Sequence, residues 1–393
     1  MGSFIYLDNS ATTKVRDEVC EAMQPYLCDK WGNPSSLHRL GYQSRTAMNK
    51  AREQAAQLIG ATPEEVYFTP CGTFSNNMAL LGRAHYVENN NLGRHLITTC
   101  IEHNSSLGPA KHLKERGWKV SHLHVSDEGV VDLEELRSLV TDETSIISLM
   151  WANNEVGTVQ PVEEIAKIAA ERNIFFHSDA IQVPGKLKID MASTPVSSLS
   201  LSGHKFYAPK GIGLLYVRKG MHVSPILFGG GQEQGISPGT ESLSNIVAIG
   251  AAAELAHNEL EHNAVHLRGI QKLLIDKLTA HPAVKLSGAC MEERLPGHVS
   301  LIVEGTVGEQ LVVEADLKGV CISSVSACKQ AGKDPSHVLA CMGMKHEQVI
   351  GSARITAGRF NTLEECEKAA DILLKIFSKR AGAGSPSPAP AAV

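Results

Sequence analysis

Polar residues with catalytic potential follow several apolar runs in the first 220 residues of the chain. Lys205 stands directly after His204, where the alternating run SLSLS reaches a loop rich in glycine and proline. Asp179 closes the run IFFHSD, and a carboxylate at the end of an apolar run is costly unless it meets a positive partner. The other residues of this kind are Gly72, Thr73, His103, Asn153, Asn154 and Ser202. Each of these residues alone is more often a turn or cap residue. Several of them at the ends of neighbouring strands together favour a binding or catalytic site.

One chemical demand fits this set, namely a carbonyl cofactor held by a lysine as a Schiff base. A buried lysine loses its charge more easily than a surface lysine, because desolvation disfavours the ammonium form, and the neutral amine can attack an aldehyde. Pyridoxal phosphate also needs a carboxylate at its ring nitrogen, an aromatic group over the ring and anion-binding groups such as a helix N-terminus for its phosphate. The candidates for these roles are Asp179, His103, Gly72, Thr73, Ser202 and His204.

The nine cysteines form no CxxC pair and no small secreted framework, so reduced thiols are expected. Most of them are expected to be small buried hydrophobes. Cys328 differs, because it lies in SSVSACKQAGKDPSH, a stretch without helical or strand period that indicates a mobile loop. An exposed or electropositive setting favours the thiolate, which is the nucleophilic form of cysteine. Cys328 is therefore the candidate nucleophile, and the other eight cysteines lack such a context.

The elements that must position these residues alternate between short apolar runs and amphipathic segments. The runs VYFT, HLITT, TSIISLMW, NIFFHSDA and GLLYV are nearly continuous in apolar character, as expected for strands buried on both faces. Between them lie helical patterns such as residues 163–172. This alternation predicts an α/β fold with a mostly parallel sheet. Ligands of open parallel sheets bind beyond the carboxyl ends of the strands, where the candidate residues stand.

The length of the chain, 393 residues, indicates two domains. We expect residues 1–15 to form an N-terminal segment that joins a smaller α+β domain. Residues 16–263 are expected to form the large domain, which ends in a long Ala-rich helical stretch, and residues 264–379 to form the small one. The tail, residues 380–393, is rich in Ala, Pro, Ser and Gly and is expected to be disordered.

Several kinds of function are not expected. The net charge of -5 has no block of one sign behind it, so neither nucleic acid nor an anionic membrane is an expected partner. No apolar run approaches the roughly 20 residues of a membrane helix, and the N-terminus lacks the features of a signal peptide, so we expect a cytoplasmic protein. His122 and His124 share one face of the predicted strand VSHLHV, but no third ligand is apparent, so we expect a solvated strand face and no metal site.

Further motifs along the chain complete the pattern. In chain order the stretches are YLDNSATT, GNPSSLH, FTPCGTFSNN, EHNS, NNEVGTVQPV, HSDAIQ, SGHKFYAPKGIG, GGGQEQG…PGTES, SSVSAC and ARITAGRF. In this order they resemble cysteine desulfurases of the NifS/IscS type, within the class V aminotransferase family and the fold-type I pyridoxal-phosphate enzymes. The resemblance covers roughly residues 6–378. It implies a mostly parallel seven-stranded sheet in the large domain and a smaller α+β domain.

The resemblance also implies a role for each residue around pyridoxal 5'-phosphate. Lys205 would be the Schiff-base lysine and proton shuttle, Asp179 would pair with the pyridinium nitrogen, and His103 would stack on the ring. Gln182 and Asn154 would contact the ring hydroxyl. The phosphate would be held by Gly72, Thr73, Ser202 and His204.

The reaction implied by the resemblance is the conversion of L-cysteine to L-alanine. Cys328 would attack the sulfur of cofactor-bound cysteine and keep it as a persulfide, for transfer to an acceptor such as an iron–sulfur scaffold protein. Arg354 and Asn154 would bind the substrate, and Arg354 would fix its α-carboxylate through a bidentate pair. Without the resemblance, a salt bridge between domains is an equally open interpretation of Arg354. Thr240 would reach the phosphate of the neighbouring subunit, which implies a homodimer.

Two other functions stay open at this point. Selenocysteine lyase, or a related pyridoxal-phosphate C–S lyase, shares the cofactor and the loop cysteine. A sulfur-binding scaffold without catalysis is supported only by departures from the family pattern, where Phe74 replaces an acidic residue and Gln234 and Ser237 replace arginines. In addition, Val325 stands before the cysteine where glycine is usual. We expect the cofactor site to survive all of these departures.

Overall fold

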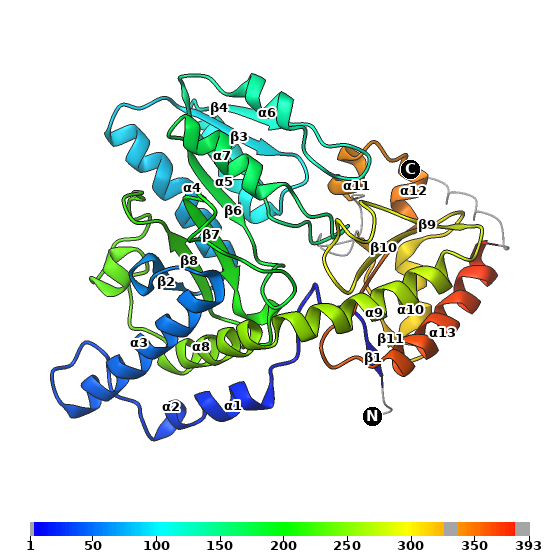
Figure 1. Ribbon diagram of the computed structural model, residues 1–393, viewed down its shortest axis with the longest axis horizontal. Coiled ribbons are helices and arrows are strands. Elements are labelled where there is room, and N and C mark those ends of the chain that lie inside the picture. Colours follow the sequence, from blue (N-terminus) through cyan, green and yellow to red (C-terminus); the bar gives the residue numbers. More distant parts are fainter. Residues whose placement is uncertain (1–3, 326–335, 382–393) are drawn as a thin grey trace, which may run out of the picture.

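The computed structural model describes residues 4–325 and 336–381, which form two groups of elements side by side (Figure 1). The larger group surrounds a seven-stranded sheet, and the smaller group surrounds a three-stranded sheet. Two consecutive helices, α8 (Leu243–Asn258) and α9 (Leu260–Leu278), run along both groups (Figure 1). In the part of the chain that is described, no helix is both long enough and apolar enough to cross a membrane.

The larger sheet has the strand order β2-β8-β7-β6-β5-β3-β4. Its strands are β2 (Val66–Thr69), β3 (His95–Thr99), β4 (Lys119–Leu123), β5 (Thr144–Ser148), β6 (Phe175–Asp179), β7 (Ser198–Ser202) and β8 (Gly213–Val217). Strand β8 runs antiparallel to its neighbours β2 and β7, and all other pairs are parallel. The predicted mostly parallel seven-stranded sheet is thus confirmed, although the apolar runs at 144–151 and 173–180 extend beyond the ends of their strands.

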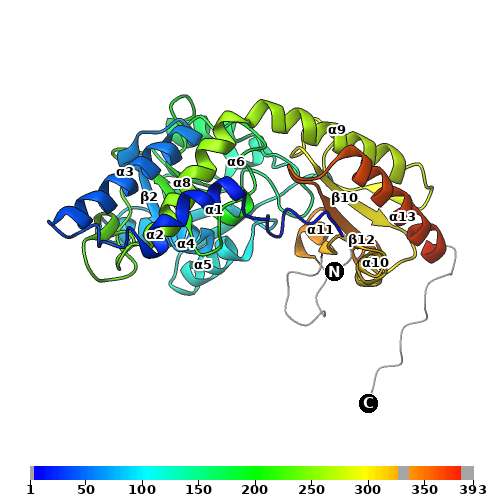
Figure 2. The same ribbon diagram turned by 90° about the horizontal axis from the view of Figure 1, so that it is seen from below.

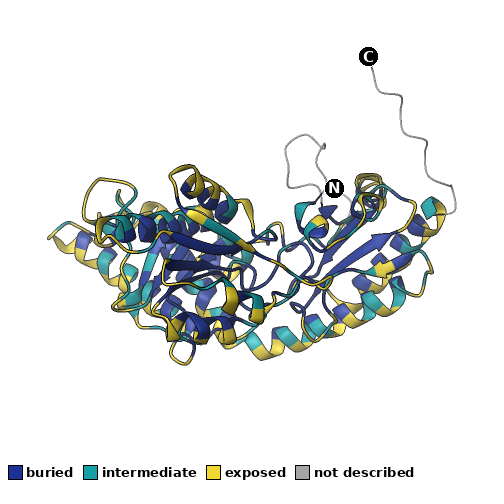
Figure 3. Cartoon of the chain, turned by 90° about the horizontal axis from the view of Figure 1, so that it is seen from above, coloured by how far each residue is buried: buried dark blue, intermediate teal, exposed yellow. Residues whose placement is uncertain are grey.

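Both faces of this sheet are covered by helices, which explains the continuous apolar runs. The helices of this group are α1 (Asp17–Met23), α2 (Pro25–Cys28), α3 (Arg39–Ile59), α4 (Gly72–Asn89), α5 (Asn104–Glu115), α6 (Leu133–Leu139), α7 (Val162–Glu171) and α8 (Leu243–Asn258). Successive residues of a strand point to opposite faces. Ile146 and Phe175 accordingly pack in the core beneath α4 and α5, whereas Ile147 and Phe176 pack in the core that includes Ile165 of α7. Figure 3 shows the strands as the buried centre and the outer helix faces as exposed.

The smaller group has its own hydrophobic core. Its elements are β1 (Ile5–Tyr6), α9 (Leu260–Leu278), β9 (Val284–Leu286), β10 (His298–Val303), α10 (Gly308–Asp316), β11 (Val320–Cys321), α11 (His337–Cys341), α12 (His346–Ile350), β12 (Ser352–Thr356) and α13 (Leu363–Ala381). Strands β12, β10 and β9 form an antiparallel sheet, and β1 pairs in parallel with β11. Helices α9 and α13 cover this sheet (Figure 2), and their apolar stripes meet its buried face in one cluster.

Two features join the groups. The expected Ala-rich helical stretch consists of two helices, because the chain leaves helical geometry at Glu259. The carboxylate of Glu259 accepts hydrogen bonds from Arg16 and Arg359. The N-terminal segment crosses from the small group to the large sheet. The backbone N–H of Asn9 donates to a carbonyl of β12, and that of Thr13 donates to the carbonyl of His204 beyond β7. This segment therefore lies against the candidate catalytic residues.

Candidate active site

A cavity of about 340 Å³ opens where the carboxyl ends of the large sheet meet the N-terminus of α4, the N-terminal segment and β12. Of the residues expected in the site, it brings together Gly72, Thr73, His103, Asn154, Asp179, Gln182, Ser202, His204, Lys205 and Arg354. Its lining is completed by Ser10, Ala11, Cys71, Ser105, Met150, Ala152 and Ile181. Asn153 does not line the cavity, because its side chain is used in a turn where it accepts from the N–H groups of Glu155 and Val156. Cys328 lies outside the described residues.

Asp179 is a buried carboxyl group in the cavity wall at the end of β6. One of its oxygens accepts from the side-chain amide of Asn76 at 2.6 Å, and the other accepts from the backbone N–H of Ile181 at 3.0 Å. Burial raises the pKa of Asp179, while these hydrogen bonds act in the opposite direction. A carboxylate held in this way is stabilised by a cationic group placed in the cavity, such as a protonated ring nitrogen.

The partner of Asp179, Asn76, was not predicted from the sequence. It lies in the first turns of α4, and its amide nitrogen also donates to Ser105 Oγ at 2.8 Å. Its amide oxygen lies 3.1 Å from Nε2 of His177, a fully buried ring whose pKa is lowered by burial to about 3. His177 is therefore neutral. Asn76 was present in the motif FTPCGTFSNN, one turn after Gly72, which is the signal that could have identified it.

His103 is the N-cap residue of α5, and this fixes its ring at the cavity. Its Nδ1 accepts from the backbone N–H of Ser105 at 3.1 Å and lies 2.8 Å from Ser105 Oγ. The ring opens onto the cavity, yet desolvation by the surrounding protein lowers its pKa. His103 is therefore a neutral, oriented ring, which suits stacking on a planar ligand.

Lys205 lies in the 3-10 turn Gly203–Lys205 that follows β7, and its side chain is half-buried. Its ammonium group donates to the carbonyl oxygens of Ser10 and Ala11, the second at 2.8 Å. These two acceptors come from the N-terminal segment and were not predicted, since backbone carbonyls carry no signal in the side-chain sequence. They hold Lys205 Nζ at the edge of the cavity.

An anion-binding cradle forms at the start of α4. The helix begins at Gly72, and the described residues provide neither a side-chain cap nor an acidic group in its first turn, so its N–H groups and positive dipole end face the cavity. Ser202 lies beside it, because a Cβ atom at position 72 would sit 3.2 Å from Ser202 Cβ and 2.4 Å from Ile181 Cδ1. Burial lowers the pKa of neighbouring His204 to about 4, so its imidazole is neutral. A side chain at position 72 would fill the cradle, which is therefore shaped for a ligand.

Gln182 presents an unsatisfied acceptor. Its amide nitrogen donates to the Ser10 carbonyl at 3.0 Å, whereas its buried Oε1 has no hydrogen-bond partner among the described residues. A buried unpaired acceptor is costly, so a donor such as a ring hydroxyl is expected to satisfy it. Together with the cradle, Asp179 and the ring of His103, this acceptor fits pyridoxal phosphate.

Arg354 projects from β12 and is buried. Its guanidinium pairs with Asp8 at 2.9 Å and donates to the backbone carbonyl of Asn154 at 3.1 Å. That carbonyl also lies 3.3 Å from Nε2 of buried His298, a positioning contact that was not predicted. The ion pair of Arg354 thus lies within the small group and its N-terminal segment, and only its hydrogen bond to Asn154 reaches the large group. Arg354 also lines the cavity, where a carboxylate can compete for its fork.

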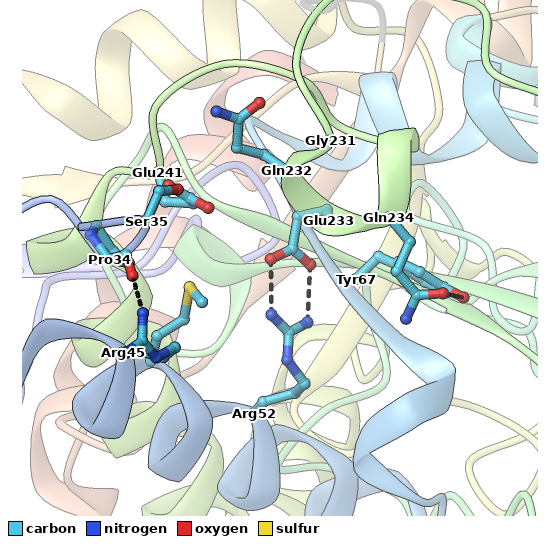
Figure 4. Close-up of a pocket in the computed structure, with 11 residues that line it drawn as sticks. Pro34, Ser35, Arg45, Arg52, Tyr67, Gly231, Gln232, Glu233, Gln234 and Glu241 are labelled. Carbon is cyan, nitrogen blue, oxygen red and sulfur yellow. Dashed lines mark hydrogen bonds and ion pairs between the residues drawn. The ribbon is translucent and has the colours of Figure 1, made fainter. Parts of the chain in front are cut away.

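Thr240 does not line this cavity. It borders a separate hollow of about 150 Å³ together with Ser237, Pro238 and Gly239. The neighbouring GGGQEQG segment lines another pocket, of about 450 Å³, in which Glu233 forms a bidentate pair with Arg52 (Figure 4). Glu233 and Gln234 both have left-handed backbone conformations, with φ of 47° and 55°. The paired carboxylate therefore holds a strained turn in which Gln234 faces Tyr67 (Figure 4).

The remaining departures from the family pattern are packing residues. Phe74 packs against a cluster that contains Met78 and Ile236 and does not line the cavity. Val325 is buried against Ile101 and Val338. Neither substitution places a new polar group in the cofactor cavity.

Two expectations about metal ligands and cysteines can be compared with the structure. In residues 4–325 and 336–381 no group of side chains is arranged to hold a metal ion, and His124 instead pairs with Glu135 at 2.6 Å. The expectation that most cysteines are buried is wrong. Among the eight described cysteines only Cys366 is buried, while Cys20, Cys28, Cys71 and Cys290 are exposed. Cys20 and Cys28 lie in the outer helices α1 and α2, and Cys71 lines the cavity at the start of α4.

Comparison with known sequences agrees with the geometry of the cavity. The Aminotransferase class-V family matches residues 5–368. The cysteine desulfurase IscS of Methanosarcina thermophila is 43% identical over 375 residues, which cover 95% of this chain and 92% of that protein. An IscS of Clostridium botulinum (strain Kyoto / Type A2) is 40% identical over 382 residues, covering 97% of this chain and 96% of that protein.

Solved structures resemble the whole chain. A NifS-like protein superposes with a TM-score of 0.89 at 36% identity, covering 96% of this chain and 100% of the other. SspA in complex with cysteine superposes with a TM-score of 0.78 at 33% identity, covering 90% of this chain and 98% of the other. The chain therefore belongs to the class-V aminotransferase family of pyridoxal-phosphate enzymes, among its cysteine desulfurases of the NifS/IscS type.

Proposed function

We propose that this protein is a pyridoxal-phosphate-dependent cysteine desulfurase that converts L-cysteine to L-alanine and keeps the sulfur as an enzyme persulfide. The observation that carries the proposal is the cavity itself. It gathers an amine, a carboxyl group and a guanidinium, from Lys205, Asp179 and Arg354, at the carboxyl edge of the large sheet. These groups lie far apart in the sequence and converge only in the fold.

The cofactor would be held by groups of known geometry. Gly72, Thr73, Ser202 and His204, which line the cavity, would hold the phosphate. Thr240 of a neighbouring subunit would join them. Asp179 would hold a proton at the ring nitrogen, His103 would stack on the ring, and Gln182 with Asn154 would meet the ring hydroxyl. When bound, pyridoxal phosphate supplies an electron sink next to the substrate's α-carbon.

Arg354 and Lys205 would act on the substrate. The guanidinium of Arg354 would bind the α-carboxylate of L-cysteine and orient the amino acid, since a planar fork matches a carboxylate. The amine of Lys205, released from the carbonyls of Ser10 and Ala11, would move the proton at the substrate's α-carbon.

Cys328 would take the sulfur. Its thiolate would form an S–S bond with the substrate's sulfur while the Cβ–S bond breaks, and the electron pair of that bond would stay with carbon. The proton of the substrate thiol ends on this carbon, so the products are alanine and the Cys328 persulfide. An acceptor such as an iron–sulfur scaffold protein would then remove the outer sulfur.

We also infer a homodimer in which Thr240 serves the neighbouring site. Pro34 and Ser35 line the pocket of Figure 4 together with residues 231–234. Each of these two segments has a large exposed apolar side chain a few residues away in the sequence. Leu37 is 95% exposed and Phe228 is 90% exposed. Exposed large apolar side chains beside a pocket mark interaction sites, and a second copy of this chain would cover them.

The cellular setting and the domain division are further parts of the proposal. The eight described cysteines are free thiols, which supports a reducing compartment such as the cytoplasm. The two largest cores, which lie almost entirely in residues 16–263 and in the residues after 264, support a large domain at 16–263 and a small one at 264–379. The N-terminal segment, residues 1–15, would join them.

Mass spectrometry of the Cys328 peptide tests this function. After the yellow protein meets L-cysteine without reductant, we expect one added sulfur on Cys328 and one alanine released. Cys328→Ser should retain the cofactor and bind cysteine without mobilising sulfur, whereas Cys290→Ser, which alters an exposed cysteine outside the cavity, should behave as the wild type. An unmodified Cys328 with pyruvate or sulfide as product would show an elimination, and turnover of selenocysteine alone would show a lyase.

A further inference from the structure

Two cysteines that the proposed mechanism does not use, Cys100 and Cys341, lie against each other beside the active site. Cys100 follows β3 and stands three residues before His103. Cys341 is the last residue of α11. Both side chains pack on the cluster that contains Ile101, and each thiol is close enough to shift the pKa of the other.

Other contacts keep this pair together. At the start of α11, Ser336 Oγ donates to Glu155 Oε2 at 2.5 Å. Nε2 of His337 lies 2.9 Å from the backbone carbonyl oxygen of Glu102. The helix is thus anchored to the loop of Cys100 at the end opposite to Cys341. Both thiols are partly exposed, so small solutes can reach them.

The surroundings lower the pKa of the Cys100 thiol and make the Cys341 thiol a hydrogen-bond donor. The hydrogen bond from Cys341, helped by nearby His124, lowers the pKa of Cys100 to about 7. Glu135 raises the pKa of His124 through a hydrogen bond and so favours its cationic form. The same contact with Cys100 raises the pKa of Cys341. Burial raises the pKa of Glu102 to about 8, so this neighbour is largely neutral at pH 7 and does not oppose the thiolate.

We propose that Cys100 and Cys341 form a redox-active dithiol that a hydroperoxide converts into a disulfide. The Cys100 thiolate attacks a peroxide oxygen, the O–O bond breaks, hydroxide or alkoxide leaves and takes up a proton, and Cys100 becomes a sulfenic acid. The Cys341 thiol then attacks this sulfur, the S–S bond forms and water leaves. The two thiols lose two electrons and the peroxide gains them.

The charge distribution favours both steps in this order. A thiolate is needed for the first attack, and Cys100 supplies it near neutral pH. The hydrogen bond to Cys100 is the largest cause of the raised pKa of Cys341, burial adds to it, and the charge of Cys100 adds less. Once Cys100 is a neutral sulfenic acid, the charge is gone and the Cys341 thiol faces the electrophilic sulfur that it attacks. The product would tie the loop that carries His103 to α11, the first described helix after Cys328. This inference concerns a modification site and does not depend on desulfurase activity.

Peptide mapping of the full-length protein after treatment with hydrogen peroxide and then an alkylating agent tests the proposal. We expect a peptide pair joined at Cys100 and Cys341, two hydrogens lighter than the thiols and separated by reductant. Cys341→Ser should lose the link and leave a Cys100 sulfenic acid that a dimedone probe captures. Cys290→Ser should form the link as the wild type does. Full alkylation of Cys100 after peroxide, or a link from Cys100 to Cys328, would overturn the proposal.

A titration of Cys100 reactivity provides the second measurement. The rate of its alkylation should rise with a midpoint near pH 7 in the wild type. Cys341→Ala removes the hydrogen-bond donor and should move the midpoint up by at least one pH unit, whereas the hydroxyl of Cys341→Ser can still donate and should move it less. His124→Gln should raise it as well, because a cation is lost. A wild-type midpoint near 8.5, the value of an ordinary thiol, would contradict the arrangement.

Discussion

The cradle at Gly72 gives the sharpest test of the cofactor site, through the substitution Gly72→Ala. The new Cβ would lie 2.4 Å from Ile181 Cδ1 and 3.2 Å from Ser202 Cβ. The first distance is shorter than real Cβ contacts allow, so Ile181 must move, and Ile181 also lines the cavity. Because Cδ1 is the far end of a flexible side chain, the cost lies near the lower end of the about 1–3 kcal/mol that overpacking takes. If about 1 kcal/mol falls on the bound state, the affinity for pyridoxal phosphate drops by about 5-fold.

Binding titrations of the cofactor-free enzyme with pyridoxal phosphate and with pyridoxal separate the phosphate effect from general damage. We expect Gly72→Ala to lower the affinity for pyridoxal phosphate more than the affinity for pyridoxal, because only the phosphate needs the N–H groups at the start of α4. Adding Ile181→Val removes Cδ1 and should restore part of the affinity, since the contact with Ser202 remains. Gly269→Ala is the matched control, because a Cβ at that helical position meets nothing within 4 Å.

Two outcomes would refute this reasoning. An unchanged affinity for pyridoxal phosphate in Gly72→Ala would show that the phosphate does not rest against position 72. Equal losses for pyridoxal and its phosphate would show that the substitution distorts the whole cavity, and the cradle would then lose its assigned role. A fall in the thermal midpoint of the cofactor-free protein, absent from the Gly269→Ala control, would indicate the same distortion.

Three further predictions concern the lysine, a buried carboxyl group and the dimer. Lys205→Ala should abolish the yellow colour of the bound cofactor and all turnover, and persistence of the absorption band would exclude the assignment. Glu102→Gln should flatten the pH dependence of stability, measured by denaturant unfolding at pH 5 and pH 8. Burial raises the folded-state pKa of Glu102 to about 8, above the unfolded value of about 4.3. The protonated carboxyl therefore stabilises the folded state fully below about pH 4.3, and this stabilisation is lost as the pH rises to about 8. If stability fell equally between pH 5 and pH 8 in the wild type and in Glu102→Gln, this account would be contradicted. Mixing Lys205→Ala with Thr240→Ala subunits should produce one intact site per mixed dimer if Thr240 acts across the interface, and activity no higher than that of the Thr240→Ala enzyme would place Thr240 in its own subunit's site.

The strands and the residues at their ends were predictable because two physical patterns coincide. Strands buried on both faces must be apolar throughout, so the positions where polar residues interrupt the runs mark the carboxyl edge of the sheet. Asp179 and Lys205 stand at such positions, after β6 and β7, and the parallel direction of these strands places both at the same edge. The family motifs then assigned a role to each residue, which periodicity alone could not do.

The parts of the site that were not predicted from the sequence are contacts that depend on the three-dimensional path of the chain. The carbonyls that hold Lys205 belong to Ser10 and Ala11, and any residue type can present a carbonyl. Asn76 reaches Asp179 only because α4 lies beneath β6, a packing that its own sequence pattern does not specify. The break at Glu259 was missed for a related reason, because no Gly or Pro marks it and the partners of its carboxylate, Arg16 and Arg359, come from distant segments.

The electrostatics of the cavity explain why position 72 is so informative. Burial lowers the pKa of His103, His177 and His204, so these three rings are neutral at neutral pH and cannot attract an anion by charge. At the start of α4 the backbone N–H groups and the helix dipole provide the attraction for a phosphate, and their strength depends on close approach. A single methyl group on Gly72 blocks that approach without changing any charge, and it tests whether the start of α4 is the anion site.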